Sequence, residues 1–177
     1  LPEQLTEARK KMEGMQKLLD ASSTIATLDP LQATENIVSE TCRILSCDRS
    51  SIFVMDQATN ELVLCVAEGA KNIRVPLGQG IAGTVAATGE TINIVDAYSD
   101  PRFSSAADKA TGYRTTTILC MPIKALSGQI VGVLQAINKK DGSFSQTDEE
   151  VMDLLSTQAG IAVQNANVYV HVIHLYL

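Results

Sequence analysis

The chain has 177 residues, 45% of them hydrophobic, and a formal net charge of -6. That length and apolar content suit one domain with a true hydrophobic core, and they exclude an intrinsically disordered segment. The acidic balance, with no basic run longer than Arg9-Lys10-Lys11, argues against a surface that binds nucleic acid or an anionic membrane.

Residues 1–28 predict a connecting helix with the apolar repeat of a coiled coil. The repeat advances by alternating steps of four and three, and Glu, Lys and Arg fill the outer positions. Its seam consists of Leu1, Leu5, Ala8, Met12, Met15, Leu19, Ser22 and Ala26. Because Ala8 and Ser22 are weak seam residues, packing of this helix on its own domain remains an alternative.

Asp29-Pro30 ends that helix and starts a second one. Beyond it, five segments predict the strands of an antiparallel sheet, and one predicts a short helix. The strands cover residues 51–55, 62–67, 91–94, 116–123 and 130–138, and the short helix covers residues 81–88. Turn residues at 57–60 and 127–129 predict that the first two strands form one hairpin and the last two form another. With the flanking helices, this order predicts an α+β fold that has the sheet in the middle and helices on both sides. We expect the domain at residues 29–165 and a continuation of the last helix at residues 166–177.

The stretch from Leu154 to Leu177 has no charged side chain and is long enough to span a bilayer. Polar residues recur through it, among them Gln158, Gln164 and Asn165. That polar content favours a helix that faces its own domain or a protein partner over a membrane span.

The four cysteines lie in apolar or helical surroundings without a C-x-x-C spacing. They are Cys42, Cys47, Cys65 and Cys120. Reduced thiols and a cytoplasmic location are expected, because disulfides persist mainly in oxidising compartments. Both histidines stand near the C-terminus, far in sequence from any cysteine, so we expect neither a metal site nor a cofactor.

A glycine-rich stretch, Gly78-Gln79-Gly80-Ile81-Ala82-Gly83, leads into the short helix. Its spacing fits the dinucleotide-binding and kinase patterns, but Pro76 interrupts the approach and the flanking strands pair locally, so both contexts are missing. Glycines let a backbone approach a ligand closely, and the free N–H groups of Ile81 and Ala82 at the helix start suit an anion. The stretch therefore predicts a phosphate site.

A second motif follows the last strand, where Asn138-Lys139 precedes Phe144 and Ser145-Gln146-Thr147-Asp148-Glu149. Ser145 predicts a helix N-cap, and Asp148, three residues on, suits a capping box. Lys139 can reach back to Asp148, which would tie the strand to the helix and fix the intervening loop. The alternative is a solvated charge pair worth only about 0–1 kcal/mol.

Both motifs, with several stretches between them, resemble cyclic-nucleotide-binding GAF domains such as those of phosphodiesterases and cyanobacterial adenylyl cyclases. The resemblance covers essentially residues 30–165. Besides the two motifs, it is carried by Thr88-Gly89, Asn93-Ile94, Asp96-Ala97-Tyr98, Pro101, Phe103, Thr111-Gly112-Tyr113-Arg114-Thr115 and Ile118-Leu119-Cys120-Met121-Pro122-Ile123. It implies a GAF fold, a cyclic phosphate on the backbone of Ile81 and Ala82, and a lid formed by residues 96–115.

The resemblance also implies side-chain contacts to the ligand. The matching positions are Ser51, Asp108, Thr111, Thr115 and Gln135. Ser104 matches a further position, where its small side chain departs from the larger one that some members carry. Structural support of the pocket, rather than contact with the base, is implied for Asn138, Lys139, Phe144, Asp148 and Glu149. Each of the contact residues also has a plainer interpretation as a turn, strand or surface residue.

The function implied is regulatory and not enzymatic. A cyclic nucleotide would bind, the lid would order, and the terminal helices of a homodimer would carry the change to the output domain of a larger protein, such as a phosphodiesterase or adenylyl cyclase. Cyclic AMP is favoured over cyclic GMP because Gln135 on the pocket floor is neutral. The alternatives are a GAF dimerisation spacer with no ligand and a methionine sulfoxide reductase that uses clustered cysteines.

Overall fold

The computed structural model describes the backbone of residues 2–25, 30–66 and 73–176, and the side chains of residues 2–17, 32–65 and 73–165. Its elements, in chain order, are α1 (Pro2–Ile25), α2 (Pro30–Leu45), β1 (Cys47–Asp56), β2 (Glu61–Val66), β3 (Arg74–Pro76), α3 (Gly80–Thr88), β4 (Ile92–Ile94), the 3₁₀ helix η1 (Ala97–Ser99), α4 (Ala106–Thr111), β5 (Ile118–Lys124), β6 (Ile130–Lys139) and α5 (Gln146–Tyr176).

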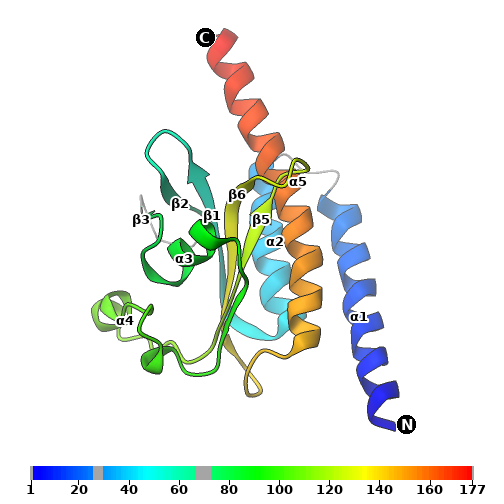
Figure 1. Ribbon diagram of the computed structural model, residues 1–177. Coiled ribbons are helices and arrows are strands. Elements are labelled where there is room, and N and C mark those ends of the chain that lie inside the picture. Colours follow the sequence, from blue (N-terminus) through cyan, green and yellow to red (C-terminus); the bar gives the residue numbers. More distant parts are fainter. Residues whose placement is uncertain (1, 26–29, 67–72, 177) are drawn as a thin grey trace.

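The strands form one six-stranded sheet in the order β3-β2-β1-β6-β5-β4 (Figure 1). Every neighbouring pair is antiparallel. The two predicted hairpins, β1–β2 and β5–β6, are present, and the β1–β6 pair joins them at the centre of the sheet. The α+β fold with a central antiparallel sheet, predicted from the sequence, is therefore confirmed.

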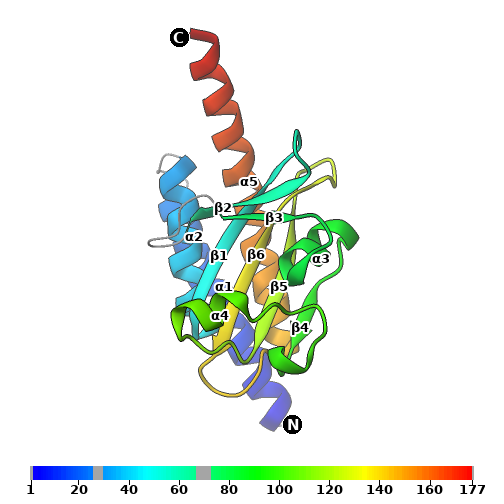
Figure 2. The same cartoon turned by 90° about the vertical axis from the view of Figure 1, so that its left-hand side faces the viewer.

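Helices cover both faces of the sheet. α2 and α5 pack on one face with α1 outside them, and α3 and α4 lie over the other face (Figures 1 and 2). Alternation along the strands divides the core in two, because successive side chains point to opposite faces. Ile52 and Leu134 belong to the core under α2 and α5, whereas Phe53 and Val133 belong to the core under α3.

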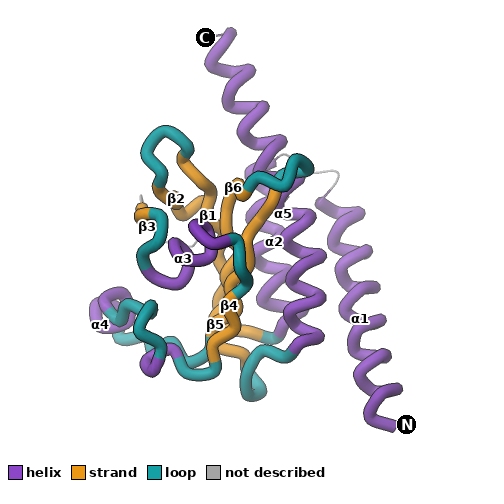
Figure 3. The backbone as a smooth tube through the Cα atoms, viewed as in Figure 1, coloured by secondary structure: helices purple, strands orange, loops and turns teal. Residues whose placement is uncertain are grey.

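The strands differ from the prediction by more than one residue at the starts of β1 and β5, and one strand was missed. β1 begins at Cys47 instead of Ser51, because its polar first residues pair with β6. β5 begins at Ile118, two residues later than expected. β3 was not predicted, since it has only three residues and ends in Pro76, which suits an edge strand. Figure 3 shows the long loops that connect α3, β4, α4 and β5.

α1 packs against α5 through one face and leaves the predicted seam outside. Thr147 donates a hydrogen bond to Glu7, Lys11 lies 2.7 Å from Glu150, and Gly14 is buried against Val151. Of the seam residues, Leu5, Met12 and Met15 are 70%, 71% and 43% exposed. The seam side chains Leu1, Leu19, Ser22 and Ala26 lie outside the described residues.

α5 runs without a break from Gln146 to Tyr176, so it includes most of the segment that was predicted to continue the last helix. Among the described residues, we find no helix that is both long and apolar enough to cross a bilayer.

Candidate ligand-binding site

A cavity of about 490 Å³ opens between the sheet, α3 and the predicted lid, residues 96–115. Small-molecule sites commonly measure about 300–1,000 Å³. Its floor is formed by Arg49, Phe53, Ile118, Gln135 and Ile137; one wall by Arg74, Val75, Pro76, Gln79, Gly80, Ile81 and Ala82; and the other by Phe103, Ser104, Ala107, Asp108, Thr111, Tyr113 and Thr115. Six of the residues predicted to contact a ligand thus converge on one cavity.

Ser51 is the predicted contact residue that does not line the cavity. It is the cross-strand partner of Gln135 in the β1–β6 pair. Alternation along β1 places it on the same face as Arg49 and Phe53, which do line the cavity. Ser51 therefore shares the cavity-facing side of β1 without lining the cavity.

The start of α3 forms the wall best suited to an anion. The N-cap residue, Gln79, makes no side-chain capping hydrogen bond. The N–H groups of Ile81 and Ala82 in the first turn have no carbonyl acceptor within the helix, and they carry the positive end of the helix dipole. Gly83 allows the turn to sit close to β3, since a Cβ there would lie 2.6 Å from Pro76 O.

Asp108 and Thr115 bind each other at the base of the lid. Asp108 is 8% exposed, and it accepts hydrogen bonds from the Thr115 N–H at 2.7 Å, the Thr115 hydroxyl at 2.9 Å and the Tyr98 hydroxyl at 2.8 Å. Burial alone would raise the pKa of this carboxyl, but these hydrogen bonds and the charge of Arg114 outweigh it and hold the pKa below its ordinary value. Both carboxylate oxygens are thus engaged within the lid.

Aromatic contacts hold the rest of the lid together. The rings of Tyr98 and Phe103 lie 5.3 Å apart, and the Arg114 guanidinium lies 4.3 Å from the Tyr98 ring centroid. The hydrogen bond to Asp108 raises the pKa of Tyr98, with partial burial acting in the same direction. Thr111 donates its hydroxyl proton to Ala107 O at 2.9 Å within α4. The lid is therefore an internally bonded unit.

Gln135 presents its amide to the cavity from β6. The Cys120 thiol lies 3.8 Å from Gln135 Oε1, and burial raises the pKa of Cys120, so this thiol is a protonated donor. The amide oxygen of Gln135 thereby faces the thiol. The described residues supply no acceptor for its amide nitrogen, which is left available to a ligand.

Asn138 joins the end of β6 to the lid arm, residues 113–116, through which the lid leads towards β5. It adopts a left-handed backbone conformation with φ 61°, which Asn tolerates better than most residues. Its Oδ1 accepts hydrogen bonds from the Thr116 N–H at 2.7 Å and from the Thr116 hydroxyl at 2.9 Å. Its Nδ2 donates to the Tyr113 hydroxyl and to Arg114 O, each at 2.8 Å. Both ends of this amide are thus used to hold the lid arm.

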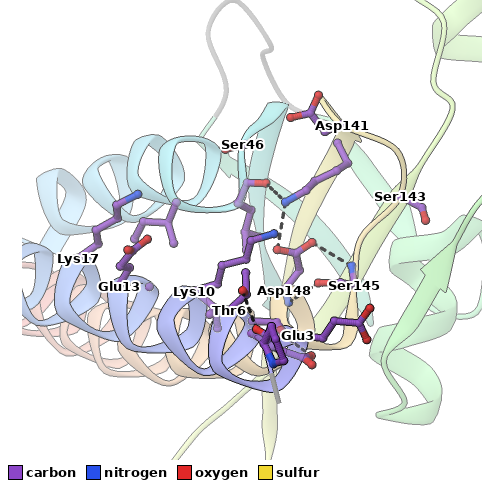
Figure 4. A pocket seen from close by; sticks show the side chains of 18 residues that line it. Glu3, Thr6, Lys10, Glu13, Lys17, Ser46, Asp141, Ser143, Ser145 and Asp148 are labelled. Atoms are coloured by element: carbon purple, nitrogen blue, oxygen red, sulfur yellow. Dashed lines mark hydrogen bonds and ion pairs between the residues drawn. The ribbon is translucent and has the colours of Figure 1, made fainter.

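The predicted Lys139–Asp148 ion pair and the capping box are both present. Lys139 Nζ lies 3.1 Å from Asp148 Oδ1 and donates to Leu45 O at 2.6 Å. Asp148 Oδ2 accepts from the Ser145 N–H at 2.9 Å, and the Asp148 N–H donates to the Ser145 hydroxyl at 3.1 Å. Figure 4 shows Asp148 beside Ser145 at the start of α5. Support of the ligand pocket by this group remains a prediction.

The two other support residues have different surroundings. Phe144 is buried in the core under α2 and α5, and its carbonyl accepts a hydrogen bond from Asn93 Nδ2 at 2.9 Å, which ties the loop to β4. Glu149 donates its N–H to Ser145 O in the first turn of α5. Its carboxylate has no hydrogen bond or ion pair within the described part of the chain.

Arg49 and Tyr113 line the cavity but were missed by sequence reasoning. The Arg49 guanidinium stacks 3.7 Å from the centroid of the Tyr113 ring, and the Tyr113 hydroxyl lies 3.3 Å from Asp48 Oδ2. The two residues come from β1 and the lid, which are far apart in sequence, so no local pattern signals their contact.

A larger cavity, about 720 Å³, lies between α1 and the adjoining ends of α2, β6 and α5 (Figure 4). It is lined mainly by polar and charged side chains, including Lys10, Glu13 and Lys17 of α1. Its edge includes Lys139 and Asp148, but none of the residues predicted to contact a ligand. We therefore regard the smaller cavity as the candidate site.

The GAF domain family model matches residues 29–163. Among curated proteins, the chain is 38% identical over 141 residues to the probable 3',5'-cyclic phosphodiesterase pde-5 of Caenorhabditis elegans, covering 72% of this chain and 19% of that protein. It is also 38% identical over 157 residues to the dual 3',5'-cyclic-AMP and -GMP phosphodiesterase 11A of Takifugu rubripes, covering 80% of this chain and 17% of that protein. The chain thus spans less than a fifth of either relative.

Solved structures share the fold at lower identity. The GAF domain of a phosphoenolpyruvate-protein phosphotransferase from Coxiella burnetii aligns with a TM-score of 0.81 and 22% identity, over 90% of this chain and 97% of that chain. A free methionine-R-sulfoxide reductase from Neisseria meningitidis aligns with a TM-score of 0.75 and 20% identity, over 90% and 93%. At these identities the likeness concerns the fold alone. By its family match and its phosphodiesterase relatives, the chain belongs to the GAF domain family.

Proposed function

We propose that this GAF domain is a regulatory sensor that binds one 3',5'-cyclic purine nucleotide in the 490 Å³ cavity. The observation that carries the proposal is the convergence of an uncapped helix start, a lid and a polar floor residue on that cavity. The α3 N–H groups supply donors for a singly charged cyclic phosphate, Thr111 faces the ligand from the lid, and Gln135 reads the base.

Within this proposal, cyclic AMP is favoured over cyclic GMP. Guanine presents adjacent N–H groups that a carboxylate can bridge, whereas adenine offers ring acceptors to a donor. The carboxylate that lines the cavity, Asp108, already accepts hydrogen bonds from Thr115 and Tyr98 through both oxygens. The available amide nitrogen of Gln135 suits a ring acceptor. These features support adenine as the bound base.

The distribution of thiols supports regulation over reductase chemistry. A thiol reacts as its thiolate, yet Cys120 beside Gln135 is fully buried and burial raises its pKa. Cys47 belongs to the core on the opposite face of the sheet, with Cys42 packed against it. The described lining of the cavity contains no activated thiol.

The signal would pass through terminal helices in a parallel homodimer. The exposed seam residues Leu5, Met12 and Met15 on α1 are available for a partner helix. The output domain would belong to a larger cytoplasmic signalling protein, such as a cyclic nucleotide phosphodiesterase or an adenylyl cyclase. A dimerisation spacer with an empty cavity is the alternative, since it needs only the helices.

Calorimetric titration with cyclic AMP, cyclic GMP and AMP tests the proposal. We expect one site per chain, tighter binding of cyclic AMP, and at least about tenfold weaker binding of AMP, whose extra charge does not suit backbone N–H donors. Gln135→Ala should weaken binding and Gln135→Glu should shift preference towards cyclic GMP. The control Gln129→Ala alters an exposed hairpin residue and should change neither. Failure of both cyclic nucleotides to bind would favour the spacer.

A further inference from the structure

The two ends of the lid meet at one point beside the sheet. The Ala97 N–H donates a hydrogen bond to Thr116 O at 2.8 Å, so residues 96–115 form a loop that is closed at its base. Asp108 and Thr115 are bonded to each other within that loop. A loop that is held together internally can move as one body, provided that its contacts with the sheet and with α3 break.

Tyr113 connects the lid to β1. The Arg49 guanidinium lies 3.7 Å from the centroid of the Tyr113 ring, and the Tyr113 hydroxyl donates to Asp48 Oδ2 at 3.3 Å. Burial and the negative charge of Asp48 raise the pKa of Tyr113, so the phenol keeps the proton that it donates. Within the described residues Arg49 forms no ion pair, which leaves its guanidinium to the stack on Tyr113.

The lid has two further attachments. Asn138 Nδ2, at the end of β6, donates to the Tyr113 hydroxyl and to Arg114 O, each at 2.8 Å, which holds the lid arm. Phe103, nearer the start of the lid, packs against the core under α3. Figure 2 shows α4, which lies between these attachments in the chain, in front of the sheet. The lid arm can therefore leave the sheet only if the contacts of Tyr113 with β1 and β6 break.

The other walls of the cavity are held more firmly than the lid. The floor consists of paired strands, with β6 bonded to both β1 and β5. The start of α3 packs so closely on β3 that a Cβ on Gly83 would lie 2.6 Å from Pro76 O. By contrast, a ring stack and side-chain hydrogen bonds hold the lid arm. The lid arm is therefore the part of the wall that opens at the lowest cost.

We propose that the Arg49–Tyr113 contact is a gate through which a cyclic nucleotide enters and leaves the cavity. Both residues line the cavity. Four residue steps of extended strand, about 13 Å, separate Arg49 from Phe53, which belongs to the same core cluster as Ile81 of α3. The gate thus lies at the end away from the N–H groups at the start of α3. This inference rests on the proposed nucleotide site.

A gate changes the rates of binding more than the affinity. The contact is made within the chain, between two residues that were not predicted to touch the ligand, so its loss should destabilise the closed lid alike in the free and bound forms. Association and release of cyclic AMP should both become about threefold faster in Arg49→Ala. In Tyr113→Leu they should become about fivefold faster, because hydrogen bonds are lost as well. The Kd should change by less than about twofold in either variant.

Stopped-flow fluorescence with an N-methylanthraniloyl derivative of cyclic AMP measures both rates. The double variant Arg49→Ala/Tyr113→Leu should be no faster than Tyr113→Leu alone, because the two residues share one contact. Lys109→Ala is the control, since it changes an exposed residue of α4 that does not line the cavity, and it should alter neither rate. Faster release with unchanged association, and a correspondingly weaker Kd, would make Arg49 a ligand contact and overturn the gate.

Hydrogen exchange tests the gate without any nucleotide. Opening separates the lid arm from Asn138, so the amides of residues 114–117 should exchange about fivefold faster in Tyr113→Leu, and about threefold faster in Arg49→Ala, than in the unchanged chain. Lys109→Ala should leave them unchanged. An unaltered exchange rate in Tyr113→Leu overturns the gate alone, whereas a chain that binds neither cyclic nucleotide refutes the proposed site.

Discussion

Lys139 Nζ lies 3.1 Å from Asp148 Oδ1, and the two side chains are only 17% and 13% exposed. The same ammonium group donates to Leu45 O at the end of α2. One cation thus connects α2, β6 and α5, and its surroundings are drier than those of a surface ion pair. Asp148 is the common element, since it also caps α5 through Ser145.

Asp148→Ala should lower the free energy of unfolding by about 2 kcal/mol, because it removes a helix cap and leaves Lys139 without its anionic partner. Hydrogen exchange of residues 138–148 should speed up in the free protein, and ligand affinity should fall as an indirect effect. Glu149→Ala is the matched control: it removes a carboxylate from the same helical turn and should change stability by about 0.5 kcal/mol or less. Unchanged exchange in Asp148→Ala would refute the tethering role.

Gly83→Ala should abolish most nucleotide binding, since its Cβ would lie 2.6 Å from Pro76 O and must push the start of α3 away from β3. Gly160→Ala is a control on the opposite face of the sheet, where the new Cβ would lie 2.5 Å from Lys124 O. Both variants should lose stability, but only Gly83→Ala should weaken binding, by at least about tenfold. Calorimetric titration at a temperature where both are folded measures this. An equal loss of affinity in both variants would show that binding does not depend specifically on the position of α3.

The sequence predicts most successfully the features that short segments determine. The capping box needs only Ser145 and Asp148 three residues apart, and the hairpins follow from strand periodicity around tight turns. The strand β3 was missed because three residues with a terminal proline carry no periodic signal. Its place at the sheet edge depends on pairing with β2, which is a tertiary event.

Local sequence patterns could not predict the contacts that form when separate segments fold together. The resemblance put Asp108 and Thr115 near a ligand, but nothing in the spacing showed that they would bind each other. The stacking of Arg49 on Tyr113 depends on how the lid folds back over β1. The face by which α1 packs was equally undetermined, because Gly14 fits a helical contact without belonging to the apolar repeat.

Met12→Glu should dissociate a homodimer without unfolding the domain, because Met12 is 71% exposed and belongs to the predicted seam. Sedimentation equilibrium at tens of micromolar should show a dimer for the intact chain, and a monomer for the variant and for a chain without residues 1–28. Gln4→Glu adds the same charge at an exposed position outside the seam and should remain dimeric. An intact chain that is monomeric would exclude the dimer and the proposed route of signal transmission.

Asp108 should make the stability of the lid depend on acidic pH. Hydrogen bonds hold the pKa of Asp108 below its ordinary value in the folded state. The unfolded chain, in which the pKa of Asp108 is about 3.9, therefore takes up the proton at a higher pH than the folded chain does. The stability that ionised Asp108 contributes is fully present above about pH 3.9 and is lost as the pH falls through the folded-state pKa.

Asp108→Asn lacks the carboxylate, so thermal unfolding should separate it from the unchanged protein near neutral pH. The gap should narrow as the pH falls below about 3.9. Tyr98→Phe removes one of the hydrogen-bond donors and keeps the carboxylate. Its folded-state pKa should lie closer to the ordinary value, so the loss of stability in acid should be smaller and should be complete at a higher pH than in the unchanged protein. A gap between Asp108→Asn and the unchanged protein that stays constant down to about pH 3 would mean that the charge of Asp108 does not stabilise the lid.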